Sequence, residues 1–349
     1  MSTETAPSVT PDERVAGVGV LRALLIKPEF GSVVGAVVLF VFFAAQSGPF
    51  HSLGGIANWL DPASTYGIMA VAVALLMIGG HFDLSAGVQL ATAGLVTSIL
   101  TVNFHLYVWA SLLVSLGVCL GFGFLNGYLV IRTRLPSFII TLASFLMLQG
   151  LNLGLTKYIT GTVSASGIAQ EVGYAGPHDL FAHEFVVQGQ SFYVAILWWF
   201  VFTMIASFIL TRTRFGNWVF AVGGDENASR NVGVPAMRTT ITLFMFVSFC
   251  AWFVGNIYLF RLTSMQASTG IGFELYYIAA AVIGGCLLTG GYGSAIGASV
   301  GAVIIGMTQQ GIVYAQWNND WFKLFLGGML LLAVLTNQFV RRYAEQSRK

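Results

Sequence analysis

The sequence predicts an all-α integral membrane protein with about ten transmembrane helices. Charged residues make up only 9% of the 349 residues, and apolar residues make up 56%. Because a soluble domain carries about 25% charged residues, this chain has too few charges to cover a water-facing surface. Many stretches of about 18 or more residues are uncharged and can cross roughly 30 Å of hydrocarbon. The 41 glycines agree with this class, since small residues let helices pack closely in lipid.

The chain begins with a segment that we expect to stay outside the bilayer. Residues 1–30 are polar at first and then weakly amphipathic, and no small-residue cleavage site follows a short apolar stretch. This pattern favours a cytoplasmic tail with a helix on the membrane surface over a signal peptide. A transmembrane domain is predicted for residues 31–340, and a second cytoplasmic tail for 341–349. The predicted spans are 31–50, 63–79, 84–104, 106–130, 136–156, 192–210, 239–260, 273–289, 293–313 and 322–340.

Lysine and arginine predict that both termini are cytoplasmic. With ten spans and the N-terminus inside, only Lys157, Arg261 and Lys323 of the 16 basic residues fall on the outside. Cytoplasmic loops carry such an excess of basic residues, and one missed span would reverse every loop after it. This topology has two long connections, an external loop at 157–191 and a cytoplasmic loop at 211–238.

The first informative segment is residues 78–87, which joins two predicted spans. The span 63–79 is short and ends in paired glycines, which is typical either of a backbone bent around a transport path or of an ordinary tight turn. Asp83 could cap the next helix, because a carboxylate is stabilised at a helix N-terminus. Alternatively it could help to fix or gate a path. The polar candidates for the path or its gate are Asp83, Ser85, Asn126 and Glu274.

The second segment lies in the long cytoplasmic loop. Residues 225–232 predict a short helix that is bracketed by Gly224 and Gly233, where glycine lets the chain turn sharply. A helix this short is marginal alone, so we expect it to pack against a partner with a groove. The alternative is a solvated loop whose arginines serve orientation only.

The third segment is residues 283–293, rich in glycine. Gly293, Gly297 and Gly301 recur every four residues, which favours close helix packing on one face, or else a thin face lining a cavity. Ile-Gly-Gly occurs at 78–80 and again at 283–285. Such internal similarity is typical of a chain built from two halves related as an inverted repeat.

Several function classes lack support in the sequence. The chain has no G-x-x-x-x-G-K-[ST] loop for ATP phosphates, no H-E-x-x-H and no G-x-S-x-G. We therefore predict no catalytic residues, no metal site and no cofactor in this chain. A net charge of +2 does not suggest a nucleic-acid partner. Ion-coupled transporters bury ionisable groups in their helices, whereas Asp83 and Glu274 lie near predicted span ends.

Together these segments resemble the membrane subunits of ABC sugar importers of the ribose/xylose type, over residues 65–335. The family motif G-G-x-D-L-S-x-G is matched by residues 80–87, with His81 where the second glycine belongs. The family pattern T-x-L-P-S-F-I-x-T-L is matched by residues 133–142, and its late G-G-Y-G-S by 290–294. Its glycine-rich cytoplasmic loop is similar to residues 216–233.

The resemblance implies a permease subunit in the cell inner membrane that works with partners. Two permease copies would pair with a cytoplasmic ATPase subunit, which hydrolyses the ATP, and would receive substrate from a periplasmic binding protein. The helix at 225–232 would be the coupling helix, pushed when the ATPases close. The residues implied for this coupling are Gly216, Gly224, Asp225, Glu226, Asn227, Ala228, Ser229, Arg230 and Gly233.

Other transport functions stay open at this point. A self-sufficient secondary transporter or channel for a small polar solute is the main alternative. Within the same superfamily, a permease for autoinducer-2 or for branched-chain amino acids also remains. The sequence does not name the solute, because apolar path residues carry no hydrogen-bond code.

Overall fold

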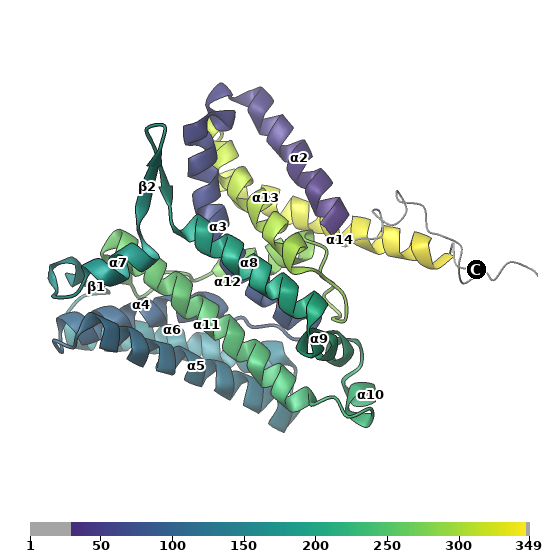
Figure 1. Ribbon diagram of the computed structural model, residues 1–349, viewed down its shortest axis with the longest axis horizontal. Coiled ribbons are helices and arrows are strands. Elements are labelled where there is room, and N and C mark those ends of the chain that lie inside the picture. The colour runs from purple at the N-terminus through teal and green to yellow at the C-terminus, as the bar shows by residue number, and fades with distance from the viewer. Residues whose placement is uncertain (1–28, 347–349) are drawn as a thin grey trace, which may run out of the picture.

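The computed structural model describes residues 29–346, with the backbone alone beyond residue 335 (Figure 1). The predicted surface helix within residues 1–28 lies outside this range. Ten described helices each overlap one predicted span. They are α2 (Glu29–Gln46), α3 (Leu53–Ile78), α4 (Ala86–Val102), α5 (Val108–Thr133), α6 (Ser137–Thr160), α8 (Ala195–Arg212), α11 (Ala236–Leu262), α12 (Phe273–Ile283), α13 (Ala295–Tyr314) and α14 (Phe322–Gln346).

Seven of the described helices are long and apolar enough to cross a membrane, namely α2, α3, α5, α6, α8, α11 and α13. The helices α4 and α12 are apolar but shorter. Helix α12 ends at Ile283 rather than at the predicted 289, because Gly284 and Gly285 turn the chain there. The chain is therefore a largely helical, multi-pass membrane protein.

Helix α3 forms the centre of the fold and packs against α8, α11, α12 and α13. It is lined with small residues, and Ile68 to Ala74 are fully buried. Gly306 of α13 lies against the α3 backbone at Trp59 and Ala63, where a side chain would not fit. Small residues let two helices approach this closely.

The expectation of a short span at 63–79 is wrong. Helix α3 begins at Leu53 and carries Pro62 inside it. The charged Asp61 interrupts the apolar pattern, but its carboxylate accepts a hydrogen bond from Arg261 of α11, with a distance of 2.6 Å between Nη2 and Oδ2. The Arg261 guanidinium also lies 3.7 Å from the Tyr193 ring centroid. Paired in this way, a charge can lie within a buried helix.

The helices α4 and α5 pack against α11, and α6 packs against α4 and α5, away from α2, α13 and α14 (Figure 1). The outer sides of α5, α6 and α8 expose large apolar side chains such as Leu113, Leu146 and Phe208. A water-soluble monomer rarely exposes so much apolar surface. This surface suits contact with lipid acyl chains or with other membrane-embedded helices.

The chain is not purely helical, because two short antiparallel sheets occur. Strand β1 (Ser164–Ser166) pairs with β4 (Ser264–Gln266), with Ala165 opposite Met265. Strands β2 (Glu184–Val187) and β3 (Gln190–Tyr193) form a hairpin. Its turn residues, Gln188 and Gly189, have φ values of 49° and 80°, as a two-residue hairpin turn of type I′ requires.

The predicted external loop at 157–191 is therefore largely structured. Helix α6 continues to Thr160, and the segment also holds the 3₁₀ turn η3 (Ile168–Gln170) and helix α7 (Ala175–Phe181). Two further 3₁₀ turns, η2 (Gly48–His51) and η4 (Asn319–Trp321), precede α3 and α14.

The predicted cytoplasmic loop at 211–238 contains two helices rather than one. The short helix expected at 225–232 is confirmed as α10 (Glu226–Asn231). Helix α9 (Arg214–Gly224) was not predicted. Its glycines disfavour a helix locally, but Gly216, Val219 and Val222 form a buried face on the rest of the protein. Tertiary packing outweighs the low helix propensity.

Candidate functional site

Helix α10 has clear start and stop signals despite its length. Asp225 is the N-cap, and its Oδ1 accepts a hydrogen bond from the Ala228 amide at 2.9 Å. At the other end, Gly233 has φ +83° and its amide donates to the Arg230 carbonyl at 3.0 Å. These caps satisfy backbone groups that a free helix of six residues would leave open.

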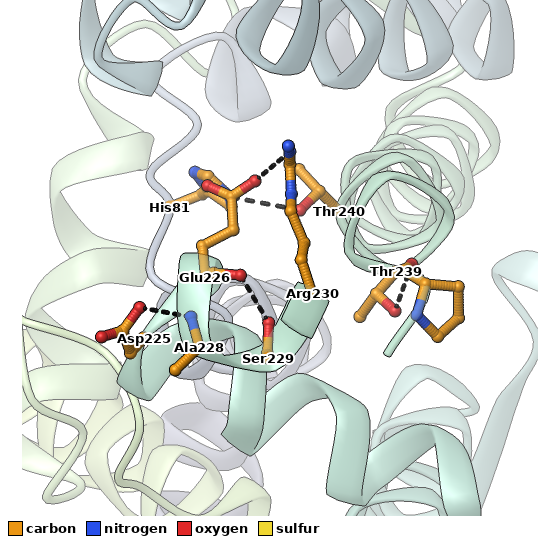
Figure 2. Close-up of polar contacts among 9 residues, drawn as sticks. His81, Asp225, Glu226, Ala228, Ser229, Arg230, Thr239 and Thr240 are labelled. Atoms are coloured by element: carbon orange, nitrogen blue, oxygen red, sulfur yellow. Dashed lines mark hydrogen bonds and ion pairs between the residues drawn. The ribbon is translucent and has the colours of Figure 1, made fainter. Parts of the chain in front are cut away.

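One side of α10 faces the protein and the other faces solvent. Ser229 is buried, and its hydroxyl donates to the Glu226 carbonyl at 2.8 Å. Arg230 pairs with the Glu226 carboxylate at 2.5 Å, and Figure 2 shows both side chains beside His81. On the free side, Val232 is 79% exposed.

Behind α10, three segments that are distant in sequence meet through their backbones. Gly223, near the end of α9, lies against the Ile78 carbonyl oxygen and the Gly291 nitrogen. The Gly291 amide itself donates to the Ile78 carbonyl at 2.8 Å. Gly290 in turn lies against Gly80 and the Gly223 carbonyl. We call this contact of residues 78–80, 223–224 and 290–291 the glycine junction.

The glycine junction brings together the three segments that the sequence singled out separately. A Cβ atom at Gly223 would collide with the Ile78 carbonyl oxygen. Glycine is therefore required here, because the backbones approach too closely for any side chain. The end of α9 is therefore in direct backbone contact with the end of α3 and with the loop before α13.

The two Ile-Gly-Gly turns have the same local geometry. Gly80 has φ +85° and Gly285 has φ +95°. The His81 amide donates to the Leu76 carbonyl and the Cys286 amide to the Ala281 carbonyl, at 3.1 and 3.0 Å. Both are six-to-one bonds of the Schellman motif, which ends a helix with glycine in the left-handed region. Residues 78–80 therefore form a tight turn that ends α3.

His81, which replaces a family glycine, fits its position without strain. The residue that needs the left-handed conformation is Gly80, and His81 is not among the residues with positive φ. Its Nε2 lies 3.2 Å from the Thr240 hydroxyl of α11 (Figure 2). Burial in this turn lowers the pKa of His81, and the nearby Glu226 carboxylate opposes the shift. The imidazole is therefore neutral at pH 7 and bridges the turn to α11.

Asp83, Ser85 and Asn126 come together in one buried polar network. The Asp83 Oδ1 accepts from the Ser85 amide at 2.8 Å and from its hydroxyl at 2.5 Å. The Ser85 hydroxyl also accepts from Gln89 at 2.7 Å and from Asn126 at 3.0 Å. The Ser144 hydroxyl of α6 donates to the Asn126 side-chain oxygen at 2.6 Å. The network thus ties the α3–α4 turn to α4, α5 and α6.

Asp83 does not cap α4 in the expected way. The N-cap position belongs to Ser85, and Asp83 bonds to that residue's own amide. Its second oxygen, Oδ2, is buried and has no hydrogen-bond partner among the described residues. Burial raises the pKa of Asp83 to about 6, against the opposing hydrogen bonds from Ser85. The buried carboxylate thus holds the α3–α4 turn to the start of α4.

Glu274 is buried at the start of α12, apart from this network. Its two carboxylate oxygens accept from the Gly272 amide at 3.2 and 3.0 Å, so it satisfies a free N–H group at a helix N-terminus. The carboxylate also lies against Gly87 of α4. The structure therefore groups three of the four path candidates and leaves Glu274 in a separate capping role.

The glycine stripe at the start of α13 is a packing surface. Gly297 lies against the Gly284 carbonyl of the preceding turn and Gly301 against the Ala280 carbonyl of α12. Gly293 precedes the helix and lies beside the Cys286 sulfur and the Ile78 side chain. Close packing, the first of the two interpretations, is confirmed.

Sequence reasoning missed two contributors to the site. One is the junction itself, which needs three glycine pairs to meet in space. The other is Ser137, whose hydroxyl accepts a hydrogen bond from the Phe82 amide at 2.9 Å. The Pro-Ser-Phe pattern that contains Ser137 signals a helix start, but nothing in the sequence indicates its partner. Within residues 29–346, no group of three His, Cys, Asp or Glu side chains could hold a metal ion.

Comparison with known proteins gives the family. Residues 55–334 match the family described as the permease component of branched-chain amino acid transport systems. The ribose import permease protein RbsC of Escherichia coli K12 is 30% identical over 312 residues, covering 88% of this chain and 93% of that protein. The L-arabinose ABC transporter permease protein AraH of Azospirillum brasilense is 32% identical over 313 residues, covering 89% and 88%.

A third relative, the fructose import permease protein FrcC of Rhizobium meliloti, is 26% identical over 312 residues, covering 89% and 85%. No solved structure matches the chain. The relatives confirm the resemblance that the motifs at 80–87, 133–142 and 290–294 indicate. Because the family match spans most of the sequence, this chain belongs to the family of permease components of branched-chain amino acid transport systems.

Proposed function

We propose that this chain is the permease subunit of an ABC importer for a sugar or a sugar-like solute. The three relatives above are named for ribose, arabinose and fructose, which favours a sugar over an amino acid. The observation that carries the proposal is α10. Helix α10 is capped and faces solvent. Gly223, three residues before it, lies against Ile78 at the end of α3 and Gly291 in the loop before α13.

In this proposal α10 docks on a separate ATPase subunit, which supplies the energy. Force applied to α10 reaches Ile78 at the end of α3 and Gly291 before α13 through the glycine junction. The Ile78 and Gly291 backbones are joined by a hydrogen bond, and Gly223 packs directly against both. Closure of the ATPases would therefore turn α3, the central helix, and change the translocation path from inward-facing to outward-facing.

The proposal extends to the assembly and its membrane. Two permease copies would form the path, a periplasmic binding protein would deliver the solute, and the complex would lie in the cell inner membrane. Ten spans are proposed, with α4, α12 and α14 completing the seven long apolar helices. The matching geometry of the two Ile-Gly-Gly turns supports two related halves.

The proposal predicts that uptake requires the ATPase and an intact α10. Uptake into proteoliposomes should need the partner ATPase and ATP, and the solute should be the one bound by the binding protein encoded beside this chain. Gly224→Pro, which breaks the entry to α10, and Arg230→Glu, which places like charge beside Glu226, should each reduce uptake about tenfold or more while membrane insertion persists. Uptake without the ATPase would establish the secondary transporter or channel instead.

The proposed orientation predicts opposite labelling of two exposed sites. Tyr158 and Val232 are 89% and 79% exposed, and the three native cysteines are buried. An impermeant maleimide should label Tyr158→Cys in intact spheroplasts, and Val232→Cys only after the membrane is opened. The reverse pattern would invert the topology, and labelling of both in intact cells would show an even number of spans between them, whereas the proposed topology has one, α8.

A further inference from the structure

A polar cleft lies beside α10 on the side facing the membrane domain. It has a volume of about 590 Å³ and is walled by three segments: the α3–α4 turn at 80–82, the end of α5 and start of α6 at 130–138, and α10. Its charged and polar side chains include His81, Arg134, Glu226, Asn227 and Arg230. The cleft is thus large enough for a side chain or a short peptide segment from another protein.

The arginines in this cleft differ in their pairing. Arg230 is neutralised by Glu226 of the same helix. Arg134 forms no hydrogen bond through its side chain and no ion pair with any described residue. It also has φ +58° at the end of α5, where its amide donates to the Val130 carbonyl at 3.0 Å. A non-glycine residue in this conformation carries a cost of about 1 kcal/mol or more, and here it places an arginine side chain on the wall of the cleft.

We propose that the α5–α6 turn and α10 form a two-walled socket that receives an acidic side chain of the ATPase subunit, with Arg134 as the cation that pairs with it. This inference rests on the proposed function and adds a second docking element to α10. Under the proposed topology, Arg132, Arg212, Arg214 and Arg238 lie on the same cytoplasmic face. Arginines are thus in excess over the acidic residues Asp225 and Glu226 at the start of α10, and a positive face steers and orients an acidic partner.

A protein carboxylate suits this cleft better than a free phosphate ion. Phosphate is bound where several donors converge, and here only Arg134 offers an unpaired guanidinium. The remaining walls include Phe82, Pro136 and Phe138, which are apolar surfaces for a peptide backbone and side chain. The location against α10 also places the socket where the proposed partner already docks.

The α3–α4 turn also lines the socket, so a partner that docks there would contact this turn directly. The Phe82 amide donates to Ser137 and the Leu84 amide to Thr141, both on α6, at 2.9 and 3.1 Å. A partner side chain held by Arg134 would therefore press on a turn that is bonded to α6. This contact would act on Phe82 and Leu84 of the turn, whereas force on α10 would act on Gly80 through the glycine junction. One partner would then move both ends of the turn.

The test compares two charge reversals on the cytoplasmic face. Wild type, Arg134→Glu and Arg214→Glu would be reconstituted in nanodiscs, and binding of the purified ATPase would be measured at low salt together with melting temperature. Arg214 is exposed at the start of α9 and does not line the cleft. Arg134→Glu should weaken binding by roughly tenfold or more, with an unchanged melting temperature and only a small effect from Arg214→Glu. Reversal of one acidic residue of the ATPase should restore binding to Arg134→Glu alone.

Each other outcome overturns the socket. Equal weakening by both variants would reduce Arg134 to general charge steering. Wild-type affinity in Arg134→Glu, with binding still blocked by Val232→Glu on α10, would remove the socket and leave the proposed function standing. Inorganic phosphate that stabilises wild type but not Arg134→Glu, without an effect on ATPase binding, would identify a small-anion site instead. Failure of the ATPase to bind wild type at all would sink the proposed function itself.

Discussion

Gly223→Ala should abolish uptake and destabilise the protein more than any other single methyl group added to the cytoplasmic loop. The new Cβ would overlap the Ile78 carbonyl oxygen and lie 2.8 Å from the Gly291 nitrogen. Both are backbone atoms that are fixed by hydrogen bonds, so neither can move aside as a side chain would. Overpacking of this kind costs about 1–3 kcal/mol or more. The melting temperature of the detergent-solubilised protein and uptake in proteoliposomes would both report the loss.

The adjacent glycine provides a matched control. A Cβ at Gly224 would meet no atom within 4 Å, so Gly224→Ala should leave the melting temperature unchanged. The same methyl group should therefore lower the melting temperature at residue 223 and leave it unchanged at residue 224. Equal melting temperatures for the two variants would show that the three backbones do not meet as closely as described.

Ser85→Ala should produce the second large loss of stability. The Ser85 hydroxyl accepts from Gln89 and Asn126 and donates to Asp83. Its removal would leave two buried amide groups without an acceptor and remove one of the two donors to a buried carboxylate. Each buried group left unsatisfied costs about 1–3 kcal/mol. The melting temperature should fall clearly, and uptake should fall with it because the α3–α4 turn loses its tie to α5.

Ser98→Ala is the matched control for this network. Ser98 lies on the same helix, α4, and is also fully buried, but its hydroxyl has no hydrogen-bond partner among the described residues. Loss of an unpaired buried hydroxyl should be neutral or slightly stabilising. If Ser98→Ala lowered the melting temperature as much as Ser85→Ala, the effect would come from packing rather than from the hydrogen bonds.

Much of the fold was predictable because the lipid environment imposes a simple pattern. Each of the ten apolar stretches overlaps a helix, and Gly297 and Gly301 mark the close contact of α12 with α13. The errors have physical causes. Asp61 obscured the first half of α3, since its partner Arg261 is distant in sequence. The glycines of α9 concealed a helix that exists because its other residues are buried.

The candidate site was predictable only in pieces. The caps of α10 are local signals, so Gly224, Asp225 and Gly233 were sufficient to place it. The meeting of Gly223 with Ile78 and Gly291 depends on tertiary structure, which no local pattern encodes. Asp83 shows the same limit. Its motif is recognisable, but the network with Asn126 and Ser144 requires three helices to assemble.

The hydrogen bond between the Gly291 amide and the Ile78 carbonyl also has a consequence for biogenesis. Ile78 ends the central helix, yet the donor for its carbonyl is synthesised long after that helix has entered the membrane. The backbone contact that supports α9 and α10 is therefore complete only after residue 291 has been synthesised. A chain that ends before residue 291 would present α10 on an incomplete support, so an ATPase that docks there would discriminate against such chains.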